Sequence, residues 1–324
     1  MQYSRIKGIE KNISRIVLGT MCSLENENEM FELFDCAYEQ GITTFDCAPV
    51  YSGGRSEIIL GKWIKMNNLQ DKVFVITKCA HPNPYRKRVS NYDILSDLED
   101  SLARTGLDYF DMYLLHRDDE SVPVSIVVET LNRIYDTGRI KCFGGSNWTH
   151  KRIETANEYA EKFGLKCFDA TSPNYSLARQ IANPWGAWAD GCVSATGDEN
   201  KAARDYYQNN QMPIFAYSSL GHGLFSGKVS TLSIEEAKKN MAIPGQIGYL
   251  YEENLERLRR AEKLADKYNV SVAQIALAFL LHQKCNIFPI VGAMTKGEIK
   301  DCVASLNVKI TNEELEWLDL VGES

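Results

Sequence analysis

The amino-acid sequence predicts a single (β/α)8 barrel over residues 1–324. Short apolar or β-branched runs alternate with amphipathic stretches along the whole chain, and such alternation indicates a parallel sheet covered by helices. About eight of these units occur in roughly 300 residues, which suits a closed barrel. An open doubly wound sheet is the alternative, but that fold usually carries G-x-G-x-x-G after its first strand. Here the first strand ends in Gly19-Thr20-Met21-Cys22, so the barrel is favoured.

Each expected strand is a short apolar or β-branched run that ends at a polar residue or a glycine. The expected strands are residues 16–20, 42–46, 73–78, 110–115, 140–144, 168–172, 213–217 and 287–291. Apolar residues at helical spacing follow the first five runs and predict helices. These helices cover residues 30–38, 56–67, 94–102, 127–135 and the region around 153–156. Gly41 and Gly138 are expected to end the first and the fourth of them.

Two connections are too long for simple barrel loops, and they span about residues 177–211 and 226–250. Loops of this length are usually functional lids or disordered linkers. Trp185 and Trp188 argue against plain disorder in the first of them.

The composition is that of a folded globular protein, with 44% hydrophobic and 24% charged residues. The formal net charge of -7 disfavours nucleic acid and an anionic membrane surface as main partners. The polar start lacks the apolar core of a secretory signal, and the longest apolar run, residues 275–281, is too short to cross a bilayer. The nine cysteines include no C-x-x-C pair, so we expect reduced thiols in the cytoplasm and no metal site.

Four ionisable residues end or follow neighbouring strands of the predicted barrel, at the edge where barrel enzymes carry their catalytic groups. Asp46 ends the second strand, Tyr51 lies just beyond it, Lys78 ends the third and His116 follows the fourth. A nearby ammonium lowers the pKa of a phenol. We therefore expect Tyr51 to exchange a proton and Lys78 and Asp46 to tune its pKa. His116 is expected either to donate a hydrogen bond to a substrate carbonyl oxygen or to relay a proton. Taken singly, each residue also has a purely structural explanation. Asp46 and Lys78 suit a structural salt bridge, Tyr51 suits a loop anchor, and His116 suits a polar cap at the end of a strand.

Several segments resemble the aldo-keto reductase superfamily in order and spacing, among them FDCAPVY at residues 45–51 and GGSN at residues 144–147. The other matching segments are residues 56–61, 76–78, 107–116, 138–141, 216–221 and 291–293. The resemblance covers nearly the whole chain and is weakest over residues 177–211. It implies a barrel that binds a nicotinamide cofactor without a Rossmann fold. Asp46, Tyr51, Lys78 and His116 match the family's catalytic tetrad, with Tyr51 as the general acid.

The resemblance also implies which residues contact the cofactor. They are Gly19, Thr20, Met21, Asp46, Ser146, Asn147, Ser172, Tyr217, Ser218, Ser219, Leu220, Gly223, Gly292, Ala293, Thr295, Lys296, Asp301 and Cys302. By this likeness Ser146 and Asn147 bind the carboxamide, and Tyr217 stacks on the nicotinamide ring. The loop from Ser218 wraps the pyrophosphate, and the region from Gly292 meets the adenosine phosphate.

Three positions depart from the family pattern. Ser172 aligns with a glutamine that holds the carboxamide, and Cys302 aligns with an asparagine that contacts adenine. Glu298 stands where many relatives have a basic residue, and a carboxylate there would repel a 2'-phosphate unless a cation such as Lys296 offsets it. NADP(H) is the expected cofactor, and NAD(H) stays open.

Aromatic side chains suit a pocket for a carbonyl or sugar-like substrate. The candidates for lining this pocket are Trp148, Trp185 and Trp188. All three could equally pack between a loop and the barrel with no contact to the substrate. Cys47 and Cys79 follow two tetrad members in sequence, and strand alternation points them away, so we interpret them as packing residues.

These inferences predict a cytoplasmic NADP(H)-dependent oxidoreductase that reduces an aldehyde or ketone, sugar-like ones included, to an alcohol. The expected partner is a small carbonyl or alcohol substrate, and the oligomeric state is not predicted. One alternative is a nicotinamide-binding regulatory or sensor subunit with little turnover, and another is an NAD(H)-preferring sugar or alcohol dehydrogenase. A barrel hydrolase or lyase would need a metal cluster or paired carboxylates, and the sequence presents neither.

Overall fold

The computed structural model describes residues 1–21, 26–186 and 191–321. Parallel strands close a barrel in the order β10-β3-β4-β5-β6-β7-β8-β9. The strands are β3 (Val17–Gly19), β4 (Thr44–Asp46), β5 (Phe74–Cys79), β6 (Phe110–Leu115), β7 (Ile140–Ser146), β8 (Ala170–Ser172), β9 (Ile214–Ala216) and β10 (Ile287–Val291). Each of them overlaps one predicted run, and β10 pairs with β3 to complete the circle. The predicted barrel is therefore confirmed.

The strands are buried along nearly their whole length and are mostly apolar, because both faces of the sheet are covered. In β5, Phe74 and Ile76 belong to the apolar cluster inside the barrel. Val75, between them, belongs to the larger cluster beneath the helices. Successive side chains of a strand point to opposite faces, so a strand buried on both sides needs an unbroken apolar run.

A short hairpin precedes the barrel and was not expected from the sequence. It consists of β1 (Tyr3–Ser4) and β2 (Ile13–Ser14), which pair antiparallel. Its Ile6 and Ile9 pack into the same interior cluster as Phe74, which begins β5. The hairpin therefore closes the end of the barrel where the strands begin, and the opposite end carries the strand termini.

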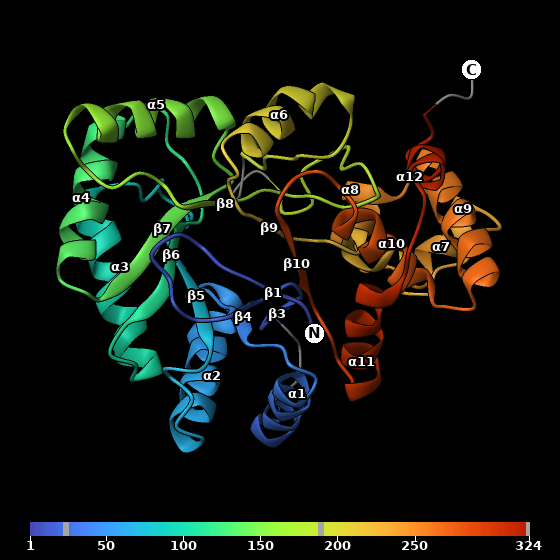
Figure 1. The fold of residues 1–324 in the computed structure, drawn as a ribbon, viewed down its shortest axis with the longest axis horizontal. Coiled ribbons are helices and arrows are strands. Elements are labelled where there is room, and N and C mark those ends of the chain that lie inside the picture. Colours follow the sequence, from blue (N-terminus) through green and yellow to red (C-terminus); the bar gives the residue numbers. More distant parts are fainter. Residues whose placement is uncertain (22–25, 187–190, 322–324) are drawn as a thin grey trace.

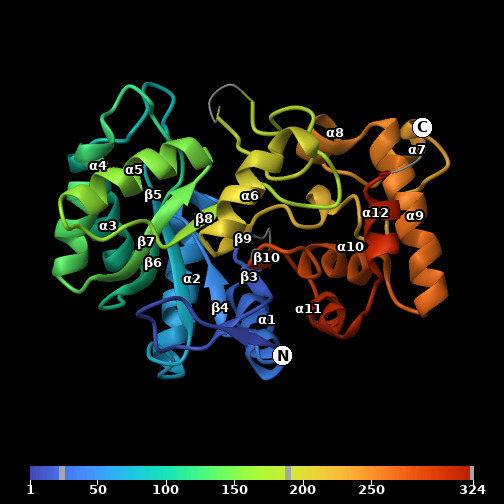
Figure 2. The ribbon, with the colours of Figure 1, turned by 45° about the horizontal axis from the view of Figure 1, so that its top comes forward.

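Helices surround the barrel (Figure 1). They are α1 (Glu27–Glu39), α2 (Arg55–Met66), α3 (Asn91–Thr105), α4 (Val124–Asp136), α5 (His150–Lys162), α6 (Lys201–Asn209), α9 (Glu252–Tyr268), α10 (Val272–Leu281), α11 (Lys296–Ala304) and α12 (Asn312–Leu318). In Figures 1 and 2 the blue-to-green helices α1 to α5 lie on one side, and the orange-to-red helices α9 to α12 lie on the other. Trp63 of α2 shows how this layer packs, because its ring contacts Phe34 of α1 at 5.4 Å and Phe45 of β4 at 5.2 Å between centroids.

The two long connections contain helices. Residues 177–211 end in α6, which packs beside α5. Residues 226–250 contain α7 (Ile234–Lys238) and α8 (Ile243–Tyr249). Both segments are thus partly helical, and Tyr249 of α8 is fully buried.

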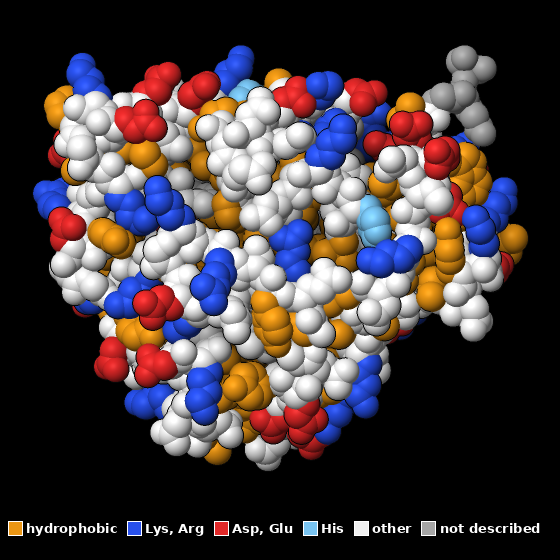
Figure 3. Space-filling view, in the orientation of Figure 1, with side chains coloured by type: hydrophobic (Ala, Val, Ile, Leu, Met, Phe, Trp, Pro, Cys, Tyr) orange, Lys and Arg blue, Asp and Glu red, His pale blue; other side chains and the backbone are white. Residues whose placement is uncertain are grey.

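The surface is mixed in character. On the face drawn in Figure 3, Lys and Arg side chains are interspersed with Asp and Glu, and hydrophobic side chains occur in small separate groups. Among the described residues no single helix is long and apolar enough to cross a membrane, although α9 and α10, bent by 100° at the break between them, pass that test as a pair.

Candidate active site

A cavity of about 530 Å³ lies at the end of the barrel opposite the hairpin. Its wall includes a residue at or just after the carboxyl end of every barrel strand. In chain order of the strands these residues are Gly19, Asp46, Lys78, His116, Ser146, Ser172, Tyr217 and Gly292. This is the end where barrel enzymes hold their chemistry.

The four ionisable residues singled out in the sequence meet in this cavity. The Lys78 ammonium donates to Asp46 Oδ1 at 2.6 Å and to the Tyr51 hydroxyl oxygen at 3.1 Å. The Tyr51 hydroxyl donates to Asp46 Oδ2 at 3.4 Å. The His116 ring lies edge-on to the Tyr51 ring, with centroids 6.0 Å apart. A phenol, an ammonium and a carboxylate thus form one contiguous network beside an imidazole.

A tight turn brings Tyr51 back over the barrel mouth. Tyr51 opens a short helical turn over Tyr51–Gly54, in which Ser52 has φ +49° and the two glycines also have positive φ. Glycine tolerates this left-handed backbone, whereas serine adopts it at a cost. The turn ends at α2, whose Ser56 donates a hydrogen bond to the carbonyl oxygen of Thr20 at 2.9 Å. The reversal keeps the phenol within reach of Lys78.

The pKa of Tyr51 differs from the expectation. Burial raises the pKa of the Tyr51 phenol to about 12, and the Lys78 ammonium opposes this shift without reversing it. Burial alone would lower the pKa of Lys78, but Asp46 and Tyr51 outweigh it and hold that pKa above its ordinary value. Tyr51 is therefore a protonated phenol and Lys78 a charged ammonium at neutral pH.

His116 is neutral at neutral pH. Burial and the nearby Lys78 and Arg117 cations lower the pKa of its imidazole well below the usual value. Its Nδ1 atom is buried and has no hydrogen-bond partner among the described residues. A neutral imidazole carries one N–H donor, so His116 is equipped to donate one hydrogen bond to a ligand oxygen.

Two cavity residues beside His116 were missed in the sequence. His81 packs against the His116 ring, with centroids 4.8 Å apart. Arg117 is 7% exposed and also lines the cavity. Arg117 follows a predicted residue directly, and His81 lies in the loop after a predicted strand. Position after a strand end was the available signal in both cases.

Most residues expected at the cofactor line this cavity. Those that do are Gly19, Met21, Asp46, Ser146, Asn147, Ser172, Tyr217, Ser218, Ser219, Leu220, Gly223, Gly292, Asp301 and Cys302. Thr20, Ala293, Thr295 and Lys296 are not in its wall. The Thr20 hydroxyl instead donates to the Asp46 carbonyl oxygen at 3.0 Å, and the Thr295 side chain caps α11.

The groups expected to hold a carboxamide are partly engaged with one another. Asn147 Oδ1 accepts hydrogen bonds from the Tyr217 hydroxyl at 2.7 Å and from the Val193 backbone at 3.1 Å. Ser172 Oγ, in contrast, is buried without a partner among the described residues. A buried hydroxyl with no partner is costly, and a polar ligand in the cavity would satisfy it. Asn147 Nδ2 already donates to the His116 carbonyl oxygen at 3.2 Å, and the Ser146 hydroxyl donates to the Ser172 carbonyl oxygen at 2.8 Å. Of this set, the Ser172 hydroxyl is therefore the group left to bind the carboxamide of a nicotinamide.

Charge at the far end of the cavity is balanced within the protein. Glu298 lines the cavity, and Lys228 pairs with its carboxylate at 2.9 Å. Lys296, expected to offset Glu298, pairs with Glu32 of α1 at 2.8 Å instead. Lys228 thus has the neutralising role that the sequence suggested for Lys296.

The tryptophans have different positions. Trp185 lines the cavity and contacts the His222 ring at 4.9 Å between centroids. Trp148 is fully buried outside the cavity wall, where it packs against Phe168 and donates to the Arg117 carbonyl oxygen at 3.4 Å. The expected pocket role therefore fits Trp185 and does not fit Trp148, which is a core residue. Trp188 lies outside the described residues.

The two cysteines that follow tetrad members in sequence are buried and stand outside the cavity wall. Burial raises the pKa of the Cys47 and Cys79 thiols well above the usual value. A protonated, enclosed thiol is a poor nucleophile. The packing interpretation of both residues agrees with these positions.

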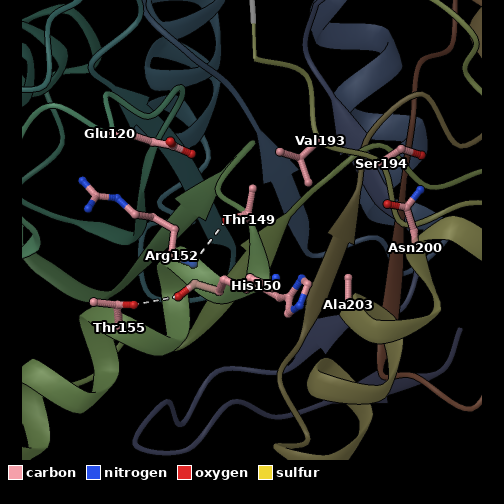
Figure 4. Close-up of a pocket in the computed structure, with 10 residues that line it drawn as sticks. Glu120, Thr149, His150, Arg152, Thr155, Val193, Ser194, Asn200 and Ala203 are labelled. Carbon is pink, nitrogen blue, oxygen red and sulfur yellow. Dashed lines mark hydrogen bonds between the residues drawn. The ribbon is translucent and has the colours of Figure 1, made fainter.

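A second pocket of about 510 Å³ lies beside the first turn of α5 (Figure 4). Thr149, His150 and Arg152 line it, with Val193 and neighbouring residues on the opposite side. Arg152 pairs with Asp118 at 3.0 Å, so its charge is already matched. The residues that line this pocket do not include a tyrosine, lysine and carboxylate network of the kind formed by the tetrad.

Comparison with known proteins points the same way. The sequence pattern of the Aldo/keto reductase family matches residues 15–323. A versiconal hemiacetal acetate reductase of Aspergillus parasiticus is 27% identical over 98% of this chain and 96% of its own length. Aldo-keto reductase YhdN of Bacillus subtilis is 28% identical over 100% and 94%. A putative voltage-gated potassium channel subunit beta of Schizosaccharomyces pombe is 28% identical over 87% and 81%.

The fold has solved counterparts as well. The crystal structure of a thermostable aldo-keto reductase in complex with the inhibitor epalrestat superposes with a TM-score of 0.72. The match covers 99% of this chain and 100% of the crystallised chain, at 23% sequence identity. At that identity the match is evidence for the fold alone. Because the family pattern spans nearly the whole sequence, the chain belongs to the aldo/keto reductase family and is an oxidoreductase.

Proposed function

We propose that the chain reduces an aldehyde or ketone to an alcohol, with Tyr51 as the general acid. The observation that carries this proposal is the Asp46–Lys78–Tyr51 network, with contacts of 2.6 Å and 3.1 Å, in a cavity lined by the ends of all the barrel strands. A nicotinamide cofactor, when bound, supplies the hydride that a carbonyl carbon accepts.

The residues of the chain supply the proton and the charge. Tyr51 donates its proton to the carbonyl oxygen as the carbon is reduced, and the C=O group becomes CH–OH. The Lys78 ammonium, already 3.1 Å from the phenol oxygen, stabilises the phenolate that forms. Asp46 holds that ammonium in place, and neutral His116 donates a hydrogen bond that orients the carbonyl. A phenol with a pKa of about 12 is protonated at neutral pH, which favours the reductive direction there.

We propose NADP(H) as the cofactor to test first, with NAD(H) beside it. Glu298 would repel a 2'-phosphate, but the ion pair with Lys228 removes most of that repulsion. The Ser172 hydroxyl has no partner within the described part of the chain. We propose that it binds the nicotinamide carboxamide in place of the glutamine with which Ser172 aligns.

The test is reduction of a reactive aromatic aldehyde, followed by cofactor absorbance, with NADPH and NADH compared. Tyr51→Phe should lower kcat by about 10²- to 10⁴-fold, the usual contribution of a general acid. Tyr85→Phe is the matched control, because Tyr85 is 93% exposed and does not line the cavity. Full activity of Tyr51→Phe would overturn the proposal.

A regulatory subunit with little turnover is the second candidate. The observation in its favour is the likeness to the Schizosaccharomyces pombe protein named as a putative channel subunit. Cofactor binding without turnover of any aldehyde in a broad panel would favour this candidate over the enzyme.

A further inference from the structure

Arg117 is a buried cation with no anionic partner among the described residues. It follows His116 at the end of β6, is 7% exposed and lines the active-site cavity. The other buried arginines, Arg257 and Arg260, each pair with a carboxylate, Arg257 with Glu253 and Arg260 with Glu256. A buried charge without a counterion is unfavourable, so the position of Arg117 needs an explanation.

The hydrogen bonds of Arg117 leave one edge of its guanidinium without a close partner among the described residues. Nη1 donates to the His116 carbonyl oxygen at 2.9 Å. Nη2 has only a long contact of 3.9 Å to the Cys192 sulfur, and Nε has no partner within the described residues. Nε and Nη2 point along the same edge of the planar group, and this edge binds a carboxylate through two parallel hydrogen bonds.

Other charged residues in the cavity wall form ion pairs within the protein. Lys78 pairs with Asp46, and Glu298 pairs with Lys228. Asp301 accepts hydrogen bonds from Ser271 and Gln274. Among the described residues, Arg117 is therefore the cavity-lining cation without a carboxylate partner, and an anionic group of a ligand beside His116 would supply one.

We propose that Arg117 binds a carboxylate of the substrate, so that the preferred substrates are aldehydes or ketones that also carry a carboxylate. The inference rests on the proposed function, since it places the substrate carbonyl at Tyr51 and His116. The inference adds a residue that determines substrate specificity. When Arg117 binds the carboxylate of the substrate, it holds the substrate carbonyl against the Tyr51 hydroxyl.

The test compares two aldehydes that differ in charge and little in shape, 4-carboxybenzaldehyde and methyl 4-formylbenzoate. The readout is the ratio of kcat/KM for the acid to kcat/KM for the ester. We expect the wild-type enzyme to favour the acid at least about tenfold, and Arg117→Met to lose that preference. Arg117→Lys keeps the charge without the paired donors, and it should retain part of the preference. Arg133→Met, on the exposed face of α4, is the matched control and should leave the ratio unchanged.

The outcomes separate this inference from the proposed function. If the wild type reduces the ester equally well, or if Arg117→Met keeps the preference for the acid, the inference is wrong and the reductase proposal stands. Loss of NADPH affinity in Arg117→Met with an unchanged ratio would assign the charge to a cofactor phosphate and overturn the inference. If neither aldehyde turns over, calorimetric titration with benzoate decides: binding by the wild type that Arg117→Met loses supports the inference, and equal or no binding refutes it.

Discussion

Replacing Lys78 with methionine should destabilise the protein as well as inactivate it. Methionine keeps most of the side-chain volume and removes the charge. Asp46 would then be a buried carboxylate without its cation, because the Asp46 and Lys78 side chains are both only 3% exposed. Removing one partner of a buried ion pair typically costs about 3–5 kcal/mol of unfolding free energy.

The geometry gives a consistent magnitude. At the N–O separation of 2.6 Å and an effective dielectric constant of ~20, the attraction between Lys78 and Asp46 is about 6 kcal/mol. Desolvation of the two groups offsets part of it, so about 3–5 kcal/mol is the expected loss. Lys78 also donates to the Cys47 carbonyl oxygen at 3.0 Å, and that hydrogen bond is lost too.

A double-mutant cycle separates stability from catalysis. In Asp46→Asn/Lys78→Met no charge of the pair remains, so the double variant should be more stable than Lys78→Met alone. Urea unfolding followed by tryptophan fluorescence at pH 7.5 measures this, and aldehyde reduction measures activity. Both variants should be inactive, because the phenolate of Tyr51 has lost its cation. A loss of under about 1 kcal/mol in Lys78→Met, or a double variant no more stable than it, would refute the reasoning.

Two further predictions concern stability. Burial lowers the pKa of His222 from 6.5 to about 4. As the pH falls, the unfolded chain therefore binds a proton at His222 before the folded chain does. Up to about 3 kcal/mol of unfolding free energy is lost between pH 6.5 and pH 4. His222→Gln should lose less stability than the wild type between pH 7.5 and pH 4.5 in urea unfolding, and equal losses would contradict the assignment. A Cβ at Gly61 of α2 would lie 2.2 Å from the Thr105 carbonyl oxygen of α3, so Gly61→Ala should cost about 1–3 kcal/mol. The control is Gly297→Ala, whose added Cβ would have no contact closer than 3.7 Å and should leave the stability unchanged or raise it by up to about 1 kcal/mol. Similar Tm values for the two variants would contradict the close approach of α2 and α3 at Gly61.

The barrel was predictable because its strands leave a strong local signal. Runs such as residues 73–78 are apolar on both faces, and only a doubly covered strand needs that pattern. The N-terminal hairpin was not predictable in the same way. Its strands have two residues each, which is too short for a period of two to appear. Ile6 and Ile9 are recognisable as core residues only after the barrel that they close is known.

The candidate site was predictable where a residue's role depends on its place after a strand. Asp46, Lys78 and His116 belong to this group. The role of Lys296 was not predictable, because its ion pair with Glu32 joins residues that are distant in sequence. Arg117 was missed for a different reason. Its position directly after His116 places it at the strand end, but arginine is normally exposed, and the sequence does not show that this one is buried in the cavity wall.

The pKa of Tyr51 shows why a list of neighbours does not predict electrostatics. From the sequence, Lys78 appeared as a cation that would lower this pKa. In the folded protein burial raises the pKa of Tyr51 to about 12, and Asp46, which matches the charge of Lys78, also acts to raise it. The ammonium thus stabilises the phenolate only once the proton has left, when Lys78 contacts two anions, the Asp46 carboxylate and the Tyr51 phenolate. Such a site holds its proton firmly in the resting state and stabilises the charge that appears during reaction, which is what a general acid in the reductive direction requires.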